Sequence, residues 1–315
     1  PRRNRDAPIE RRHQDIAASL QARLEEVLFA ILNRLYGLNK LDKLCMAGGL
    51  SFNCVTNGKI CDYTPFRKIY IQPAAGDAGL AIGAAYYVWH QILNRPRDFV
   101  MEHSYWGPSY SSESIGYELG AMGDEFSKQG CKIIKIHDEE ELCRRVALEL
   151  ANGKVVGWFQ GRMEWGPRAL GNRSILADPR HSEIKEILNS KIKHRESFRP
   201  FASSILEEKV DEYCKKYQSS PFMLFVYKVR PEKKGTIPAV VHVDGTTRIQ
   251  DVSKRANPLF WRLIKEFESI THVPVLLNTS FNENEPIVNA PGEALDCFLR
   301  TKMDILAMGE YLIIR

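Results

Sequence analysis

The sequence predicts a mixed α/β (α+β) fold divided into two domains, for three reasons. The chain has 315 residues, more than a single domain usually holds. Patterns typical of helices and of strands alternate along it. Between residues 94 and 112 both patterns stop, and Pro96, Pro108 and clustered Tyr and Ser residues take their place. We therefore expect a first domain over 1–104 and a second over 105–315.

The first domain opens with an amphipathic helix that we expect to end at Gly37. Its apolar residues recur at spacings of three and four, namely Ile16, Leu20, Leu24, Val27, Ile31 and Leu35. Short strands are predicted over 43–47 and 68–72. Residues 80–93 are predicted to form a helix rich in small side chains, which suits close packing.

In the second domain, one helix begins after Asp138, which together with Glu141 resembles a capping box. A second helix is predicted over 182–192 with Ser182 as its cap, and the last helix begins at Pro291. The remaining predicted elements are a helix over 258–267, strands over 155–159, 201–206, 222–229, 239–243 and 274–278, and a strand or strand pair over 304–314.

Composition narrows the partners and the compartment. The 44 basic and 39 acidic residues leave a net charge of +5, which argues against a nucleic-acid partner and for local anionic ligands. No apolar run approaches the about 20 residues of a membrane span, so we expect no membrane association. The seven cysteines are scattered with no C-x-x-C pair, which is typical of a reduced, cytoplasmic protein.

Cationic side chains gather in the second domain. Arg168 and Arg173 lie in a glycine-rich segment, Lys193 and Arg199 follow in a second cluster, and Arg248 stands further along. Their neighbours are apolar, and charges in such surroundings are usually paired or bind a ligand. Because these groups suit phosphate and carboxylate, we expect them to converge on a polyanion such as carbamoyl phosphate or ATP. For any one of them, simple solvation at the surface is the open alternative.

Two glycine-rich junctions in the first domain, Gly48-Gly49 and the segment 76–79, each follow a predicted strand. Backbone N–H groups at such junctions suit phosphate oxygens. Asp77, placed between glycines, is suited to hold a metal ion or a metal-bound water. The alternative is that both junctions are plain tight turns.

Hydrogen-bonding side chains gather where the strand predicted near residue 278 ends. Asn278, Ser280 and Asn282 lie there within five residues. Ligands of α/β proteins commonly bind at the ends of strands, so we expect these three to bind substrate. An ordinary Asn/Ser turn is the alternative here.

Taken together, these residues resemble the carbamoyltransferases of the nodulation and antibiotic-tailoring type, over essentially the whole chain. The matching stretches are 15–21, 48–54, 76–79, 166–174, 198–201 and 277–282. The resemblance implies a partial actin/Hsp70-like ATPase lobe followed by a twisted open sheet like that of threonylcarbamoyl-adenylate synthase. It also implies that the second domain makes a carbamoyl adenylate from carbamoyl phosphate and ATP. The first domain would then move the carbamoyl group to the hydroxyl of a small-molecule acceptor.

The resemblance also implies roles for single residues. Four correspond to the K-x-R and S-x-N signatures of the synthase, the first with a longer spacing: Lys193, Arg199, Ser280 and Asn282. Arg168 and Arg248 would hold carbamoyl phosphate. The residues implied to line a nucleotide in the first domain are Gly48, Gly49, Asn53 and Gly76. Mg²⁺ would accompany ATP, and Asp77 would bind Fe or Mn at the transfer site.

In one respect the chain departs from the family pattern. The family's first domain begins with a lobe that supplies a pair of metal-binding histidines, and nothing here resembles that lobe. We therefore expect a C-terminal portion of a longer protein, with the missing N-terminal lobe as a partner and with Asp77 lacking its fellow ligands. Two other functions stay open. One is a tRNA threonylcarbamoyl-type modification protein, which the mild charge disfavours. The other is a nucleotide-binding module that is inactive without the lobe.

Overall fold

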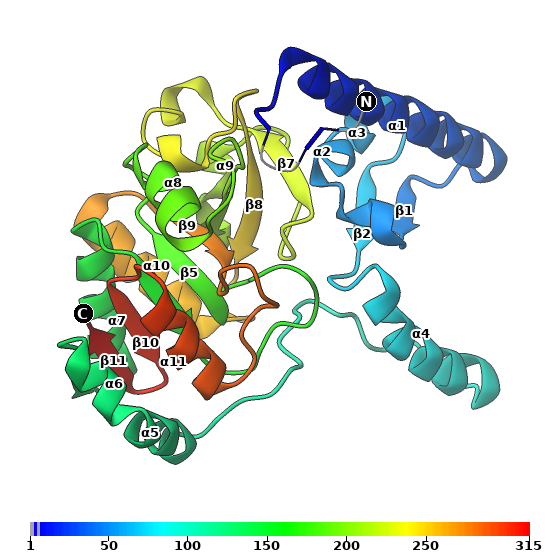
Figure 1. The fold of residues 1–315 in the computed structure, drawn as a ribbon. Helices are drawn as coiled ribbons and strands as arrows, with labels where there is room; N and C mark the ends of the chain where they lie inside the picture. The colour runs from blue at the N-terminus through cyan, green and yellow to red at the C-terminus, as the bar shows by residue number, and fades with distance from the viewer. Residues whose placement is uncertain (1–2, 5–6) are drawn as a thin grey trace.

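A computed structural model describes residues 3–4 and 7–315 and divides their strands between a small and a large sheet (Figure 1). The small sheet pairs β1 (Lys43–Met46) in parallel with β2 (Lys68–Ile71). Both strands lie where the sequence predicts them. The helical segments of this first part are α1 (Arg11–Asn39), η1 (Gly49–Phe52), α2 (Cys54–Asn57), α3 (Ile60–Tyr63), η2 (Asp77–Gly79), α4 (Leu80–Tyr87) and η3 (Val88–Ile92).

The large sheet is mixed, and within the described residues its order is β3-β11-β10-β4-β5-β9-β6-β8-β7. β10 runs parallel to β4 and β6 parallel to β8, whereas the other neighbours are antiparallel. The strands are β3 (Lys132–Lys135), β4 (Val156–Phe159), β5 (Arg173–Ala177), β6 (Ala202–Leu206), β7 (Phe225–Lys228), β8 (Thr246–Val252), β9 (Val275–Ser280), β10 (Ile305–Met308) and β11 (Tyr311–Ile314).

The helical segments around the large sheet complete the α/β class that the sequence predicts. They are α5 (Ser112–Ala121), α6 (Gly123–Lys128), α7 (Glu139–Ala151), α8 (Ile184–Ile187), η4 (Leu188–Ile192), η5 (Glu207–Lys209), α9 (Val210–Tyr213), η6 (Pro231–Lys233), η7 (Pro238–Val240), α10 (Pro258–Thr271) and α11 (Pro291–Arg300).

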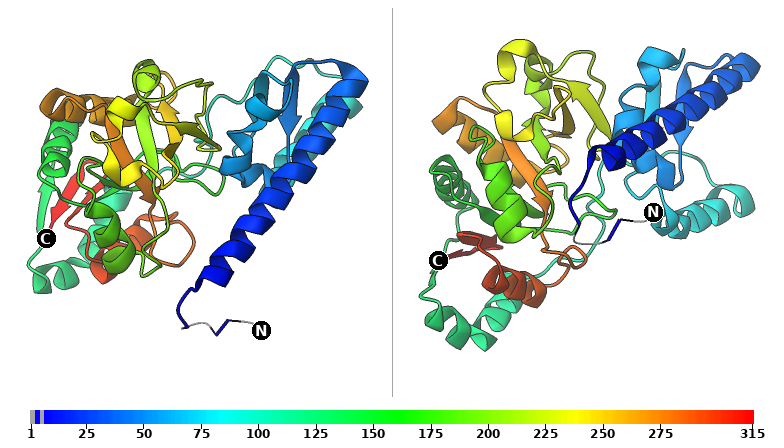
Figure 2. Two further views of the ribbon diagram at one scale, coloured as in Figure 1. Left: turned by 90° about the horizontal axis from the view of Figure 1, so that it is seen from above. Right: turned by 45° about the horizontal axis from the view of Figure 1, so that its top comes forward.

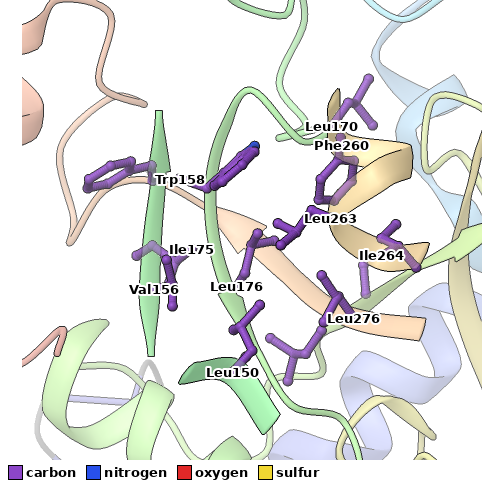
Figure 3. Packing of buried hydrophobic residues seen from close by; sticks show 14 of the residues in the cluster. Leu150, Val156, Trp158, Leu170, Ile175, Leu176, Phe260, Leu263, Ile264 and Leu276 are labelled. Carbon is purple, nitrogen blue, oxygen red and sulfur yellow. The ribbon is translucent and has the colours of Figure 1, made fainter. Parts of the chain in front are cut away.

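Helix α10 packs against the centre of the large sheet. Phe260, Leu263 and Ile264 of α10 lie beside Leu176 of β5 and Leu276 of β9 (Figure 3). All five side chains are fully buried. Burying an apolar side chain of this size stabilises a fold by roughly 1.5–3 kcal/mol. This contact therefore makes the middle of the sheet a rigid support for the strand ends beyond it.

Helix α1 is longer than predicted and buries a different face. It continues through Gly37 and ends at Lys40, whose φ of 54° is left-handed. Its buried residues are Phe29 and Leu32, which pack with Leu44, Ile60 and Phe66 in a small separate core. Most of the predicted apolar stripe instead faces outward, with exposed fractions of 64% at Ile16, 71% at Leu20, 43% at Val27 and 57% at Ile31. Helix α1 runs along the outside of the molecule (Figure 2). The stripe is a second apolar face, which is exposed within the described chain.

The small-residue helix does not pack closely either. α4 projects away from the large sheet (Figure 1), and it buries none of its residues against the described chain. In α4 and η3, Leu80, Tyr87 and Trp89 are 71%, 62% and 48% exposed. Extensive apolar surface of this kind marks a binding surface more often than a free one.

Three local expectations in the second part are wrong. The strand predicted over 239–243 begins as the turn of η7, because Pro238 fixes φ and has no N–H to pair. Asp138 does cap α7, but the Glu141 carboxylate pairs with two arginines of its own helix instead of completing a capping box. Ser182 does not cap α8, since its hydroxyl donates to Glu183.

Two findings bear on compartment and membrane. Helices long and apolar enough to cross a bilayer are absent from residues 3–4 and 7–315. All seven cysteines lie in this described part and are free thiols.

Gly171→Ala should destabilise the fold sharply. Gly171 has a φ of +101°, and a β-carbon there would lie 2.1 Å from the Phe260 ring, so backbone and core would both have to move. We expect the free energy of unfolding in urea to fall by about 2–5 kcal/mol. Gly130→Ala is the matched control, because its φ is +68° and its β-carbon would meet nothing within 4 Å. Equal losses in the two variants would contradict the packing.

Candidate functional site

A row of three residues crosses the large sheet. Arg248 on β8, Ala202 on β6 and Asn278 on β9 are direct register partners, so their side chains point to the same face. Ala202, between the two longer side chains, is small. The Arg248 Nε and the Asn278 Oδ1 are buried and have no hydrogen-bond partner within the described chain. Because buried polar atoms are nearly always paired, an unpaired donor and acceptor beside an alanine indicate a ligand site.

Arg168 joins this row from the glycine-rich loop. Its Nη2 donates to the Phe52 carbonyl at 3.2 Å, and its Nε is buried and has no partner among the described residues. Burial, followed by repulsion from Arg248, lowers the pKa of Arg168 to about 10. Two guanidinium groups that repel one another cost free energy, and an anion between them would offset that cost.

The loop that carries Arg168 is held by a buried carboxylate. Glu164 Oε1 accepts hydrogen bonds from three backbone N–H groups, those of Leu170 at 2.7 Å, Asn172 at 2.7 Å and Arg173 at 3.2 Å. Gly166 has a φ of +127°, and a β-carbon there would lie 2.6 Å from the Pro73 carbonyl oxygen. The loop therefore runs tightly against the first part of the chain, which fixes Arg168 beside Phe52.

Lys193 lies beside the end of β9, where the sequence predicts its partners. Its Nζ donates to the Ser280 carbonyl at 2.5 Å and to the Asn282 carbonyl and Oδ1 at 2.6 and 2.7 Å. Burial, followed by the charge of Arg195, lowers the pKa of Lys193 to about 7. The structure thus brings together Lys193, Ser280 and Asn282.

Arg195 is the cation of this region that the sequence-based site omits. Its Nε donates to Asn189 Oδ1 at 2.7 Å, and its guanidinium carbon lies 4.8 Å from the centre of the Phe201 ring. Burial, followed by repulsion from Arg199 and Arg248, lowers the pKa of Arg195 to about 10. A signal was present, because Lys193-His194-Arg195 carries K-x-R at its regular spacing.

We call these five cations the cationic site: Arg168, Lys193, Arg195, Arg199 and Arg248. Lys193, Arg195 and Arg199 line an open cavity of about 830 Å³, together with Ser280 and Asn282. Arg199 pairs with Glu196 at 2.8 Å, and both side chains are largely exposed. Positive charge thus exceeds negative charge at the site, an arrangement that binds phosphate groups and stabilises charge that develops on them.

Arg173, predicted to bind substrate, is fully buried; both of its Nη atoms donate to backbone carbonyls, while its Nε is buried without a partner within the described residues. Its Nη1 donates to the Gln160 carbonyl at 2.7 Å and its Nη2 to the Pro108 carbonyl at 3.3 Å. The guanidinium carbon lies 3.7 Å from the centre of the Phe159 ring. These contacts favour a structural role, in which Arg173 ties the segment around Pro108 to β5.

The residues predicted to bind nucleotide and metal in the first part are only partly brought together. Gly48, Gly76 and Asp77 line one cavity of about 600 Å³, and Gly49 adjoins it. Asn53 instead serves the local fold. Its Oδ1 accepts from the Thr56 N–H at 3.1 Å and its Nδ2 donates to the Gln21 side chain at 2.8 Å, which joins α2 to α1.

Asp77 stands without the neighbours that a complete metal centre needs. In residues 3–4 and 7–315, no three His, Cys, Asp or Glu side chains gather in a group that could hold a metal ion. The residues present therefore do not fit an iron or manganese centre by themselves, and we assign no step to such a metal in this chain.

Two family models match this chain. "Carbamoyltransferase C-terminus" matches residues 147–315 and "Carbamoyltransferase N-terminus" matches residues 2–86. The chain belongs to the carbamoyltransferase family. Its cationic site lies mainly in the region of the C-terminal model, and the cavity at Asp77 lies in the region of the N-terminal one. Because both models match, they give no support to the expectation of an absent first lobe.

Individual relatives agree with the family. An uncharacterized protein of Synechocystis is 44% identical over 338 residues, which cover 99% of this carbamoyltransferase chain and 54% of the relative. Nodulation protein NolNO of Sinorhizobium fredii is 43% identical over 317 residues, 99% of this chain and 45% of its own. The chain thus spans about half the length of these curated relatives. The solved structure of full-length HypF in the phosphate- and nucleotide-bound form is more remote, with 21% identity and a TM-score of 0.39 over 56% of this chain and 22% of its own.

Arg173→Met should cost stability. Removing the guanidinium leaves the Gln160 carbonyl buried without its side-chain donor and takes one of two donors from the Pro108 carbonyl, so we expect unfolding in urea to require about 3–5 kcal/mol less free energy. Arg144→Met is the control, since Arg144 is an exposed arginine of α7 and its loss should leave the stability nearly unchanged. A stable Arg173→Met protein that has lost affinity for carbamoyl phosphate would instead favour the substrate-binding role.

Proposed function

We propose that this carbamoyltransferase activates carbamoyl phosphate with ATP at the cationic site, forming a carbamoyl adenylate. It would then transfer the carbamoyl group to the hydroxyl of a small-molecule acceptor at the cavity lined by Asp77. The observation that carries the proposal is the uncompensated charge around Arg248, where two guanidinium groups have buried, unpaired Nε atoms. Both substrates are polyanions, and they supply the negative charge that the described residues lack.

The cations fall into two groups by position, and each group is assigned to one substrate. Arg248, in the row beside Ala202, and Arg168, which lies near Arg248, are assigned to the phosphate of carbamoyl phosphate. Lys193, Arg195 and Arg199 line the open cavity and are assigned to the triphosphate of ATP. Mg²⁺, held by the triphosphate itself, would neutralise part of its charge.

The proposed reaction has two bond-breaking steps before transfer. Water hydrolyses carbamoyl phosphate, which releases phosphate and leaves carbamate in the site. A carbamate oxygen then attacks the α-phosphorus of ATP, and pyrophosphate leaves with the electron pair of the broken P–O bond. The lysine and the arginines stabilise the charge that grows on the leaving pyrophosphate, which is the main way in which proteins accelerate such transfers.

Two observations near Gly48 support the transfer half of the proposal. Gly48 has a φ of +100° and nothing within 4 Å of where a β-carbon would stand, so the backbone there is open to a ligand. Arg168 donates to Phe52 in η1, the segment that follows Gly48, which joins the loop that carries Arg168 to this segment by one hydrogen bond. The acceptor is proposed only as a hydroxyl compound.

A second candidate function has one observation in its favour. The outward stripe of α1 and the unburied α4 leave large apolar side chains exposed, Leu20 and Leu80 at 71% each. If a further lobe normally covers these surfaces, the chain alone would bind nucleotide and fail to transfer. Addition of the first lobe of a relative as a separate polypeptide would then restore transfer.

Arg168→Met and Arg248→Met test the assignment of the carbamoyl phosphate. Each removes a charge-assisted contact worth about 1.5–3 kcal/mol, so we expect exchange of labelled pyrophosphate into ATP to fall about 10- to 100-fold. This exchange should depend on carbamoyl phosphate in the wild type. Arg144→Met should match the wild type, and full exchange in both site variants would exclude the assignment.

The pH dependence should report Lys193. Burial lowers its pKa to about 7, so the free protein loses this positive charge as the pH rises through 7 and binds the ATP phosphates less well above it. We expect kcat/KM for ATP in the exchange reaction to decline above about pH 7. Lys193→Arg keeps its charge and should lack this decline, whereas an increase of the wild-type value between pH 7 and 9 would contradict the assignment.

A further inference from the structure

The segment that presents Asn282 to Lys193 is not fixed by apolar packing. Loop 281–288 and the helix that follows it, α11, enclose a cavity of about 320 Å³ between them. Phe281 and Val288 are buried at the two ends of the loop, but the residues between them are partly or fully exposed. Something other than packing must therefore hold the loop in shape.

One guanidinium spans this cavity and joins the loop to the helix. Arg300, in the last turn of α11, donates from Nη1 to Glu283 Oε2 at 2.7 Å and from Nη2 to Glu285 Oε1 at 3.0 Å. Its Nε donates to Asp296 Oδ2 at 2.8 Å, which anchors the side chain to its own helix. Hydrogen bonds to Asp296 and Glu285 raise the pKa of Arg300, so it is charged at every pH of interest.

Glu285 connects Arg300 to Asn282 through hydrogen bonds within the loop. Its carboxylate accepts from the N–H groups of Glu283 at 3.2 Å and Asn284 at 3.0 Å, and its carbonyl accepts from Asn282 Nδ2 at 2.5 Å. Burial alone would raise the pKa of Glu285, but the backbone hydrogen bonds outweigh it and bring the pKa to about 2. With Nδ2 engaged in this way, the Asn282 oxygens are left to face the Lys193 Nζ.

We propose that Arg300 is a positioning residue: by clamping Glu283 and Glu285 it shapes the loop so that Asn282 and Ser280 hold the Lys193 ammonium in the cationic site. Its effect on the reaction rests on the proposed function, whereas its effect on Lys193 does not. Arg300 itself touches neither Lys193 nor the row at Arg248. Its loss should therefore act through the loop alone.

The electrostatic surroundings of Lys193 make this effect measurable. Beyond burial, the charge of Arg195 lowers the pKa of Lys193, while Cys297 of α11 and Glu285 raise it slightly. The Cys297 thiol is neutral near pH 7, because burial raises its pKa to about 12. The other charged or titratable groups at the cavity of Lys193 are Arg3, His194, Glu196, Arg199 and Glu283. Among these groups, Glu283 and Glu285 are the two that accept hydrogen bonds from Arg300.

Arg300→Met is the direct test, with two readouts. If the loop relaxes, the ammonium loses acceptors, and the pKa of Lys193 should fall by about one pH unit, the equivalent of one charge-assisted hydrogen bond. NMR titration of isotope-labelled lysine, with the signal assigned through Lys193→Arg, measures this without any substrate. The decline of kcat/KM with pH should move down by the same amount, with pyrophosphate exchange reduced about 10-fold. Arg300→Lys, which can keep one contact, should fall between the two.

The controls separate this proposal from the function it builds on. Arg144→Met should leave both readouts unchanged. An unmoved Lys193 titration in folded Arg300→Met protein would overturn the positioning role, whatever its activity. If the wild type shows no exchange, the proposed function fails, yet the titration still decides the role of Arg300. Should Arg300→Met not fold, Asp296→Asn removes the carboxylate that anchors Arg300 to its own helix, loosens the same clamp, and is expected to shift the titration of Lys193 in the same direction.

Discussion

The repulsion between Arg168 and Arg248 is the constraint on which the site depends. The Arg248 guanidinium lies close enough to that of Arg168 to lower the pKa of Arg168, and each of the two keeps a buried Nε without a partner in the described chain. A folded protein keeps such a costly arrangement only if the surrounding structure enforces it and a ligand recovers the cost. The register of β8 with β6 fixes Arg248, and the Glu164 carboxylate with the close approach at Gly166 fixes Arg168.

The structure around that pair is held in place in two different ways. α10 packs the centre of the sheet and makes the strand ends rigid, while the loop after β9 lacks such packing and is held by charged hydrogen bonds from α11 instead. Lys193 depends on both the packed sheet and the clamped loop. Its side chain is buried in the protein, and its Nζ donates to Asn282 in the loop. A rigid half and a clamped half can together hold several cations near one another, although Glu196 pairs with only one of them, Arg199.

The sequence predicts the α/β class and most helices and strands, because their apolar periodicity is strong. It misses β3, β5 and β8. In the last two the pattern of a buried strand is hidden, because Arg173 opens β5, and Arg248, Gln250 and Asp251 interrupt β8. The stripe of α1 shows the converse, since a real apolar periodicity beginning at Ile16 marks an exposed face. Periodicity reports an apolar face but not what covers it.

For the site, residue type and neighbourhood indicate Lys193, Ser280 and Asn282, and the structure brings them together. The same reasoning does not reveal that Arg173 donates to backbone carbonyls, because these hydrogen bonds depend on the path of the segment around Pro108. Nor can it find Arg300, whose importance comes from an unpacked gap between a loop and a helix. Contacts between distant segments decide these roles.

The most direct measurement is the stoichiometry of products released by this chain from carbamoyl phosphate, ATP and Mg²⁺ with no acceptor present. If the cationic site performs the adenylation, pyrophosphate should appear only when carbamoyl phosphate and ATP are both present, accompanied by at least an equal amount of phosphate. Binding of ATP with no pyrophosphate formed in the presence of carbamoyl phosphate would contradict adenylation by these residues.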